Sequence, residues 1–212
     1  PPQDADIQRA RRAYFGAISF VDHQLELLLD TLSETGLDKT TAIVFTSDHG
    51  EMLGEHGQWY KMSFREGAGR VPLIIALPGQ AQARRVTQAV SLADVGPTLC
   101  ALAHAPLIPH TDGRDLSACL AGAQLEEDQI FGEYLGEGTF APTVMIRRGR
   151  WKFVHTPGDP DQLYDLIHDA DETRNLARHP DHTQTEAAFL NEAQRRWNFE
   201  ALYRSVLLSQ QR

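Results

Sequence analysis

The sequence contains little cysteine: Cys100 and Cys119 are the only two among 212 residues. Two cysteines cannot build the disulfide framework of a small secreted domain, and they indicate a reducing compartment. No apolar run approaches the roughly 20 residues that a membrane-spanning helix needs. Twenty basic against twenty-nine acidic residues leave a net charge of −9, and no basic block stands out. These absences argue against a membrane or a nucleic acid as a partner.

The first part of the chain predicts an α/β arrangement. Apolar residues at intervals of three, four and seven between Ile7 and Leu32 predict a long helix, which Gly36 ends. The short apolar run 42–45 is typical of a strand buried on both faces of a parallel sheet, and 71–77 predicts a second strand. Because a parallel sheet needs more strands than these two, we expect the others to precede Pro1.

The pattern changes after residue 122. Short apolar runs separated by Gly, Pro and Asp predict a small antiparallel sheet, and they lie at 129–134, 143–147, 150–155 and 162–166. Helical spacing returns over 184–208 and predicts a terminal helix. Its expected anchors are Phe189, Trp197, Leu202 and Leu208. The predicted domains are therefore residues 1–122, part of an α/β domain, and residues 123–212, a small sheet with a terminal helix.

Residues 47–69 form a long, glycine-rich stretch without periodicity, which is typical of a functional loop. It begins with Asp48, His49 and Gly50 directly after the first predicted strand. Ligands bind beyond the carboxyl ends of strands in open α/β sheets, and a carboxylate beside an imidazole can ligate a divalent cation. Gly50 would let the backbone turn sharply. The alternative is that Asp48 caps a helix and His49 packs in the interior.

Lys61 lies further along the same loop, where its ammonium group could neutralise an oxyanion such as sulfate or phosphate. The alternative is a solvated surface lysine. Trp59 and Tyr60 could offer an aromatic face to a cation, or could simply hold the loop in place. His56 is the candidate histidine for a substrate contact, because it lies between the Asp-His pair and Lys61, and the alternative is a loop histidine that does not touch substrate. The other histidines share no ligand spacing.

Several segments in this order resemble the C-terminal half of the sulfatase family, which belongs to the alkaline-phosphatase-like superfamily. Those segments are Ser47-Asp48-His49-Gly50-Glu51, Trp59-Tyr60-Lys61, residues 70–75, Tyr14-Phe15-Gly16-Ala17-Ile18 with Asp22, and Leu163-Tyr164-Asp165-Leu166 followed by Glu172 and Asn175-Leu176-Ala177. Within the family, residues 59–64 and 132–150 look most like choline sulfatases. The resemblance implies a fold in which residues 1–122 complete an alkaline-phosphatase-like α/β domain.

The resemblance also implies an activity, the hydrolysis of a sulfate ester, with choline-O-sulfate giving choline and sulfate as the favoured reaction. Asp48 and His49 match the family's metal ligands, with Ca²⁺ favoured and Mn²⁺ as the alternative. Lys61 matches the catalytic lysine that contacts the sulfate. Glu137 is the candidate acidic contact for the trimethylammonium group, the alternative being an exposed loop carboxylate.

Family members use a formylglycine nucleophile made from a Cys or Ser in a Cys/Ser-X-Pro-X-Arg motif. Neither Cys100 nor Cys119 is followed by X-Pro-X-Arg, so we interpret both as buried apolar residues. This chain therefore contains no candidate nucleophile. We expect the formylglycine in an N-terminal half of the same enzyme that precedes Pro1, and we expect the 212 residues alone to be inactive.

The expected partners are a small-molecule sulfate ester, the N-terminal half of the enzyme and further copies in a homo-oligomer, with the bacterial cytoplasm as location. Two other functions stay open. A phosphonate monoester or phosphodiester hydrolase of the same superfamily would share the Asp-His pair. A non-catalytic assembly module would instead leave Asp48 and His49 pointing apart or into a core.

Overall fold

The structure is a computed structural model that describes residues 2–80, 82–136 and 139–210. The chain forms two compact units, one made of Pro1–Lys61 and Gly67–Ala83 and the other of Met62–Glu66 and Arg84–Arg212. The domain division that the sequence predicts at residue 122 stays a prediction. Among the described residues, no helix is both long and apolar enough to cross a membrane.

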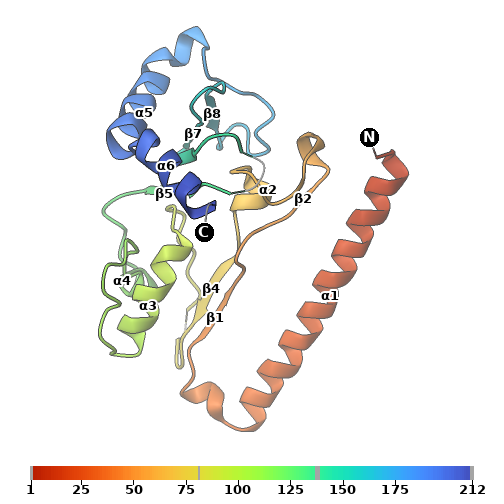
Figure 1. Cartoon of the computed structure of the whole chain (residues 1–212). Coiled ribbons are helices and arrows are strands. Elements are labelled where there is room, and N and C mark those ends of the chain that lie inside the picture. The colour runs from red at the N-terminus through yellow and green to blue at the C-terminus, as the bar shows by residue number, and fades with distance from the viewer. Residues whose placement is uncertain (1, 81, 137–138, 211–212) are drawn as a thin grey trace. The chain divides into compact units, whose positions relative to one another are not determined.

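The first unit begins with the long helix that the sequence predicts, α1 (Asp4–Glu34) (Figure 1). Gly36 follows the C-terminal cap with a φ of 72°, a left-handed conformation that glycine adopts without steric cost. The helix contains no buried residue, and apolar side chains such as Phe15, Val21 and Leu28 are more than half exposed. Its apolar stripe is therefore uncovered by the described part of the chain.

Two strands of the first unit pair with each other, β1 (Ile43–Thr46) and β4 (Leu73–Ala76). The pairing is antiparallel, with Val44 opposite Ile75 (Figure 1). The expectation of a strand buried on both faces of a parallel sheet is wrong for this pair, whose β1 residues are only half-buried. The reason is the connection: the chain between the strands folds back without the crossover helix that parallel neighbours need.

The stretch between β1 and β4 contains more structure than the long loop that the sequence predicts. Two strands of two residues each, β2 (Met52–Leu53) and β3 (Trp59–Tyr60), form a hairpin, and the 3₁₀ turn η2 (Glu55–Gly57) lies in its loop. The short helix α2 (Glu66–Gly69) follows the hairpin. These elements are too short to give a hydrophobic period, which is why the sequence did not reveal them.

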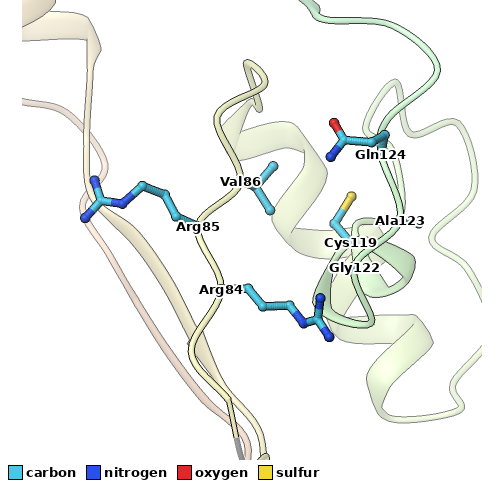
Figure 2. Close-up of a pocket in the computed structure, with 7 residues that line it drawn as sticks. All are labelled: Arg84, Arg85, Val86, Cys119, Gly122, Ala123 and Gln124. Carbon is cyan, nitrogen blue, oxygen red and sulfur yellow. The ribbon is translucent and has the colours of Figure 1, made fainter.

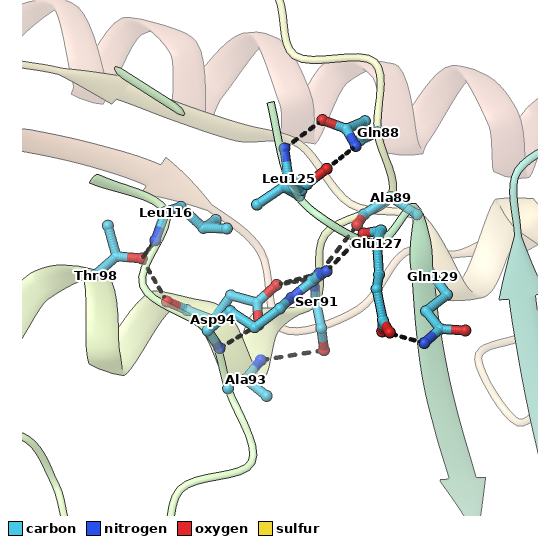
Figure 3. A network of polar contacts seen from close by, with 12 residues as sticks. Gln88, Ala89, Ser91, Ala93, Asp94, Thr98, Leu116, Leu125, Glu127 and Gln129 are labelled. Atoms are coloured by element: carbon cyan, nitrogen blue, oxygen red, sulfur yellow. Dashed lines mark hydrogen bonds and ion pairs between the residues drawn. The ribbon is translucent and has the colours of Figure 1, made fainter. Parts of the chain in front are cut away.

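The second unit is organised in its first part around the buried carboxylate of Asp94, at the end of η3 (Leu92–Asp94) and before α3 (Val95–Leu102) (Figure 3). One carboxylate oxygen accepts the backbone N–H of Arg114 at 2.7 Å. The other accepts Nη2 of Arg114 and the backbone N–H of Ser91, each at 2.9 Å. Asp94 thus ties together two segments twenty residues apart.

The remainder of the second unit contains the predicted antiparallel sheet, in the order β5-β6-β7-β8. Its strands are β5 (Gln129–Tyr134), β6 (Thr143–Arg148), β7 (Trp151–His155) and β8 (Gln162–Asp165). Other short elements are α4 (Ser117–Leu120) and η4 (Pro180–His182) in this unit and η1 (Leu37–Lys39) in the first unit.

The terminal helix that the sequence predicts is in fact two helices, α5 (Thr183–Arg196) and α6 (Phe199–Gln210). The chain is extended at Trp197, with a ψ of 129°. Phe189 and Trp197 are buried in the core against the sheet as expected, and Leu202 packs against it. Leu208 is 62% exposed, so its predicted role as an anchor is wrong.

Candidate functional site

The segment that follows β1 brings the side chains of Asp48 and His49 together. Oδ1 of Asp48 accepts the backbone N–H of His49 at 2.9 Å, and the hydroxyl of Ser47 donates to the His49 carbonyl at 2.8 Å. These bonds fix a tight local conformation, in which Oδ2 of Asp48 lies 3.3 Å from Nε2 of His49. The two side chains therefore converge, rather than pointing apart.

The backbone carbonyl of Gly50 orients the His49 ring. Nδ1 of His49 lies 2.8 Å from this oxygen, and a carbonyl only accepts hydrogen bonds, so Nδ1 carries a proton. In the neutral ring, Nε2 then holds the lone pair. This is the arrangement in which a histidine ligates a cation through one nitrogen while the other is held by a carbonyl.

Lys61 reaches the same atom from the end of the β2–β3 hairpin. Its Nζ lies 2.7 Å from Nε2 of His49, so the ammonium group donates to the lone pair. Tyr60, immediately before it, has a φ of 68°, which is uncommon outside glycine and costs free energy. Such strained residues gather at functional sites, and this one directs the chain where Lys61 leaves the hairpin.

The Asp48 carboxylate is open to solvent, with 83% of its side chain exposed. Desolvation raises the pKa of this carboxyl, but the hydrogen bonds from the His49 N–H and the Ser47 hydroxyl and the nearby His49 side chain outweigh it, so the pKa lies below its ordinary value. Asp48 is therefore ionised at neutral pH and is accessible to a ligand.

The donor set suits a divalent cation but is incomplete. Oxygen and nitrogen ligands lie about 2.0–2.6 Å from such ions, so two of them can be about 3 Å apart, as Oδ2 of Asp48 and Nε2 of His49 are. No group of three or more His, Cys, Asp or Glu residues that could hold a metal occurs in the described ranges. The two residues fit as part of a metal site whose other ligands come from elsewhere.

Gly50, which directly follows Asp48 and His49 in the sequence, packs against α2. Its N–H donates to the carbonyl of Ala68 at 2.7 Å, and a Cβ at position 50 would overlap the carbonyl oxygen of Gly67. Gly50 is not among the glycines with positive φ. The backbone at Gly50 therefore does not use the left-handed conformation, and the close approach of two backbones explains the glycine.

The hairpin that leads to Lys61 is attached to α1. Nε of Arg11 donates to the carbonyl of Leu53 at 3.0 Å, and Nη2 of Arg11 lies 2.9 Å from Oε1 of Glu55. The sequence analysis missed this attachment, because the two charged residues are 44 positions apart and neither stands in a motif. His56 lies at the exposed tip of the hairpin with a φ of 53°, and its predicted contact with substrate stays a prediction.

Glu137 lies outside the described residues, so the proposed acidic contact is not placed. Cys119 is buried, as predicted, whereas Cys100 is only half-buried. The Cys119 side chain lines a small pocket of the second unit beside Val86 and Gln124, and the Arg84 side chain extends toward Gly122 (Figure 2). None of the predicted site residues lines this pocket.

The chain is similar to known protein families and to individual proteins. Residues 1–105 match the family described as Sulfatase, and residues 54–197 match the one described as N-sulphoglucosamine sulphohydrolase, C-terminal. The chain is 43% identical over 215 residues to the choline-sulfatase of Rhizobium meliloti (strain 1021), a match that covers 99% of this chain and 42% of the relative. It is 36% identical over 184 residues to arylsulfatase K of Gallus gallus, covering 81% of this chain and 34% of the relative.

Among solved structures, the phosphonate monoester hydrolase of Agrobacterium radiobacter is similar, with a TM-score of 0.77 and 31% identity. The similarity covers 95% of this chain and 42% of the hydrolase. This chain therefore spans less than half the length of the proteins it matches.

Proposed function

Because this chain belongs to the sulfatase family, we propose that it supplies part of the active site of a sulfate-ester hydrolase whose substrate is choline-O-sulfate. The observation that carries the proposal is the convergence of Asp48, His49 and Lys61, with Nζ of Lys61 and Oδ2 of Asp48 at 2.7 Å and 3.3 Å from Nε2 of His49. The 43% identity with a choline-sulfatase over nearly the whole chain supports this substrate.

In the proposed mechanism, Lys61 binds a sulfate oxygen through its ammonium group and neutralises the charge that builds up there as the ester bond breaks. Oδ2 of Asp48 and Nε2 of His49 would hold a divalent cation, with Ca²⁺ favoured over Mn²⁺. When bound, such a cation polarises the sulfate oxygens. The carbonyl of Gly50 keeps the His49 ring in the required tautomer. The nucleophile is proposed to be a formylglycine outside these 212 residues.

The proposal is tested by replacing Lys61 in the full-length protein and measuring hydrolysis of choline-O-sulfate. We expect Lys61→Met to lower kcat by about 10²- to 10³-fold, the cost of removing one group that stabilises a developing oxyanion. Lys39→Met is the matched control, because Lys39 is an exposed lysine of η1 in the same unit. Equal rates in wild-type and Lys61→Met would overturn the proposal.

A second candidate function is the hydrolysis of phosphonate monoesters, which the likeness to the Agrobacterium radiobacter enzyme favours. An ammonium group beside an Asp-His pair can neutralise a phosphonate as well as a sulfate. The two candidates differ in kcat/KM, measured on choline-O-sulfate and on a phenyl phosphonate ester with the same preparation. We expect the sulfate ester to be the better substrate by about tenfold or more, at least 1.4 kcal/mol of transition-state binding.

A further inference from the structure

A buried group of charges lies in the second unit, and the sequence analysis assigned no function to any of its members. Lys152 on β7 has only 3% of its side chain exposed. Its Nζ donates to the carbonyl of Phe64 at 2.6 Å and to Oε1 of Glu66 at 2.8 Å. It also forms an ion pair with Glu172, whose side chain is 2% exposed. We call Lys152, Glu66 and Glu172 the ion cluster.

Glu172 makes further contacts in addition to its ion pair with Lys152. Its Oε2 accepts the backbone N–H of Glu66 at 2.7 Å, and its own carbonyl accepts Nη1 of Arg65 at 2.7 Å. Its φ is 54°, a strained value for a residue other than glycine. Such strain persists only where the surroundings over-determine the conformation. Every one of these contacts is made to residues 62–66.

Stability alone does not explain the ion cluster. Removing charges from water costs several kcal/mol per ion, so a buried ion pair is seldom more stabilising than apolar residues of the same volume. What such pairs can provide is a defined position for the segment they hold. Here the segment is residues 62–66, which continues directly from Lys61 and contains the first residue of α2.

The four-residue helix α2 belongs to both compact units. Its first residue, Glu66, is held by the ion cluster of the second unit. Its third residue, Ala68, accepts the N–H of Gly50 in the first unit, and Gly50 directly follows His49. The carbonyl of Gly50 in turn orients the His49 ring. The Glu172 side chain thus holds the first residue of α2, and the third residue of α2 holds the backbone next to His49.

We propose that Lys152 and Glu172 are positioning residues, which fix α2 and through it the backbone that carries His49 and Lys61. This inference rests on the proposed function of that pair, since it assigns to the ion cluster the task of holding the site in its working geometry.

Amide hydrogen exchange in the Glu172→Gln variant tests the proposal without any measurement of activity. The substitution keeps the shape of the side chain and removes its charge. If the ion cluster positions α2, exchange becomes about tenfold faster or more at both Glu66 and Gly50, since both bonds open more often. Glu192→Gln is the matched control, because Glu192 is paired with Arg148 elsewhere in the second unit. Faster exchange at Glu66 with unchanged exchange at Gly50 would overturn the proposal.

A double-mutant cycle in the full-length protein separates this inference from the proposed function. Glu172→Gln should lower kcat for choline-O-sulfate by about ten- to hundredfold with little change in KM, as expected when reacting groups are misplaced. In a Lys61→Met background the same substitution should have a much smaller effect, because coupled residues are not additive. Lys152→Arg, which keeps the charge, should retain more activity than Lys152→Met.

The outcomes of this cycle are distinguishable. If Lys61→Met leaves hydrolysis unchanged, the proposed function fails. If Lys61→Met lowers hydrolysis but Glu172→Gln has the same effect in both backgrounds, the ion cluster is merely structural and the positioning role fails. Should Lys152→Met not fold, Glu172→Gln and Lys152→Arg still give the answer.

Discussion

Nζ of Lys61 lies 2.7 Å from Nε2 of His49, so an ammonium group faces the lone pair that a metal ion would need. A cation and Lys61 therefore compete for one nitrogen atom. Lys61 can bind an anionic substrate while His49 binds a metal ion only if the Lys61 ammonium group moves away from Nε2 of His49 when the cation binds. This competition gives a prediction that separates the two residues.

Replacing Asp48 should weaken metal binding, whereas replacing Lys61 should not. In Asp48→Asn a charged ligand is lost, and we expect the affinity of the full-length protein for Mn²⁺ to fall by about tenfold to hundredfold. In Lys61→Met the competitor for Nε2 of His49 is removed, so the affinity should stay the same or rise. Titration with Mn²⁺, followed by electron paramagnetic resonance, measures both. A loss of affinity in Lys61→Met would contradict the competition.

Two glycines of the first unit should respond to alanine with opposite signs. A methyl group at Gly50 would overlap the Gly67 carbonyl and break the 2.7 Å bond to Ala68, so Gly50→Ala should destabilise the fold by about 1–3 kcal/mol. Gly16 lies inside α1 with no atom within 4 Å of an added Cβ. Gly16→Ala should stabilise by about 0.5–1 kcal/mol through helix propensity. Urea unfolding measures both, and destabilisation of similar size in the two variants would contradict the assignment.

Local patterns of apolar residues in the sequence predicted most of the long helices and strands. The spacing from Ile7 to Leu32 predicted α1, and the short apolar runs after residue 122 predicted the four strands β5 to β8, because each element depends on its own periodicity. The likeness to solved structures supports the predicted fold class, the C-terminal part of an alkaline-phosphatase-like α/β domain. The break at Trp197 was missed, since apolar spacing continues into α6, where Leu202 packs against the same core.

Relationships between distant segments could not be predicted in this way. The antiparallel pairing of β1 with β4 depends on how the chain returns, and the bond from Lys152 to Glu66 joins residues 86 positions apart. The sequence contains one indication of the bond between Lys152 and Glu66. Lys152 interrupts an apolar strand, and a charged side chain in that position needs a buried partner. At the candidate site, the Asp48-His49 pair followed from its place after a strand, but the direction of its side chains did not.

The buried carboxylate of Asp94 should be a strong determinant of stability. Asp94→Ala removes the carboxylate partner of the Arg114 guanidinium and leaves the N–H groups of Ser91 and Arg114 without their acceptor, which should cost about 3–5 kcal/mol of unfolding free energy. Glu200→Gln is the control, because the Glu200–Arg204 pair is about three-quarters exposed and should change stability by less than about 1 kcal/mol. Thermal unfolding checks both, and comparable losses in the two variants would refute the role of Asp94.

The attachment of the hairpin to α1 should depend on pH through Glu55. Desolvation raises the pKa of this carboxyl, but the N–H of Leu53 and the charge of Arg11 outweigh it, so the folded pKa lies below the ordinary value of 4.5. A lowered pKa means that the stabilisation is complete above the pKa of the unfolded chain and is lost as the pH falls through the folded value. Arg11→Gln removes the charge but keeps the Leu53 bond at 2.6 Å, so the pKa should rise only part of the way to 4.5. Carbon NMR of the Glu55 carboxyl during an acid titration measures this, and an unchanged pKa in Arg11→Gln would show that Arg11 does not hold the hairpin by its charge.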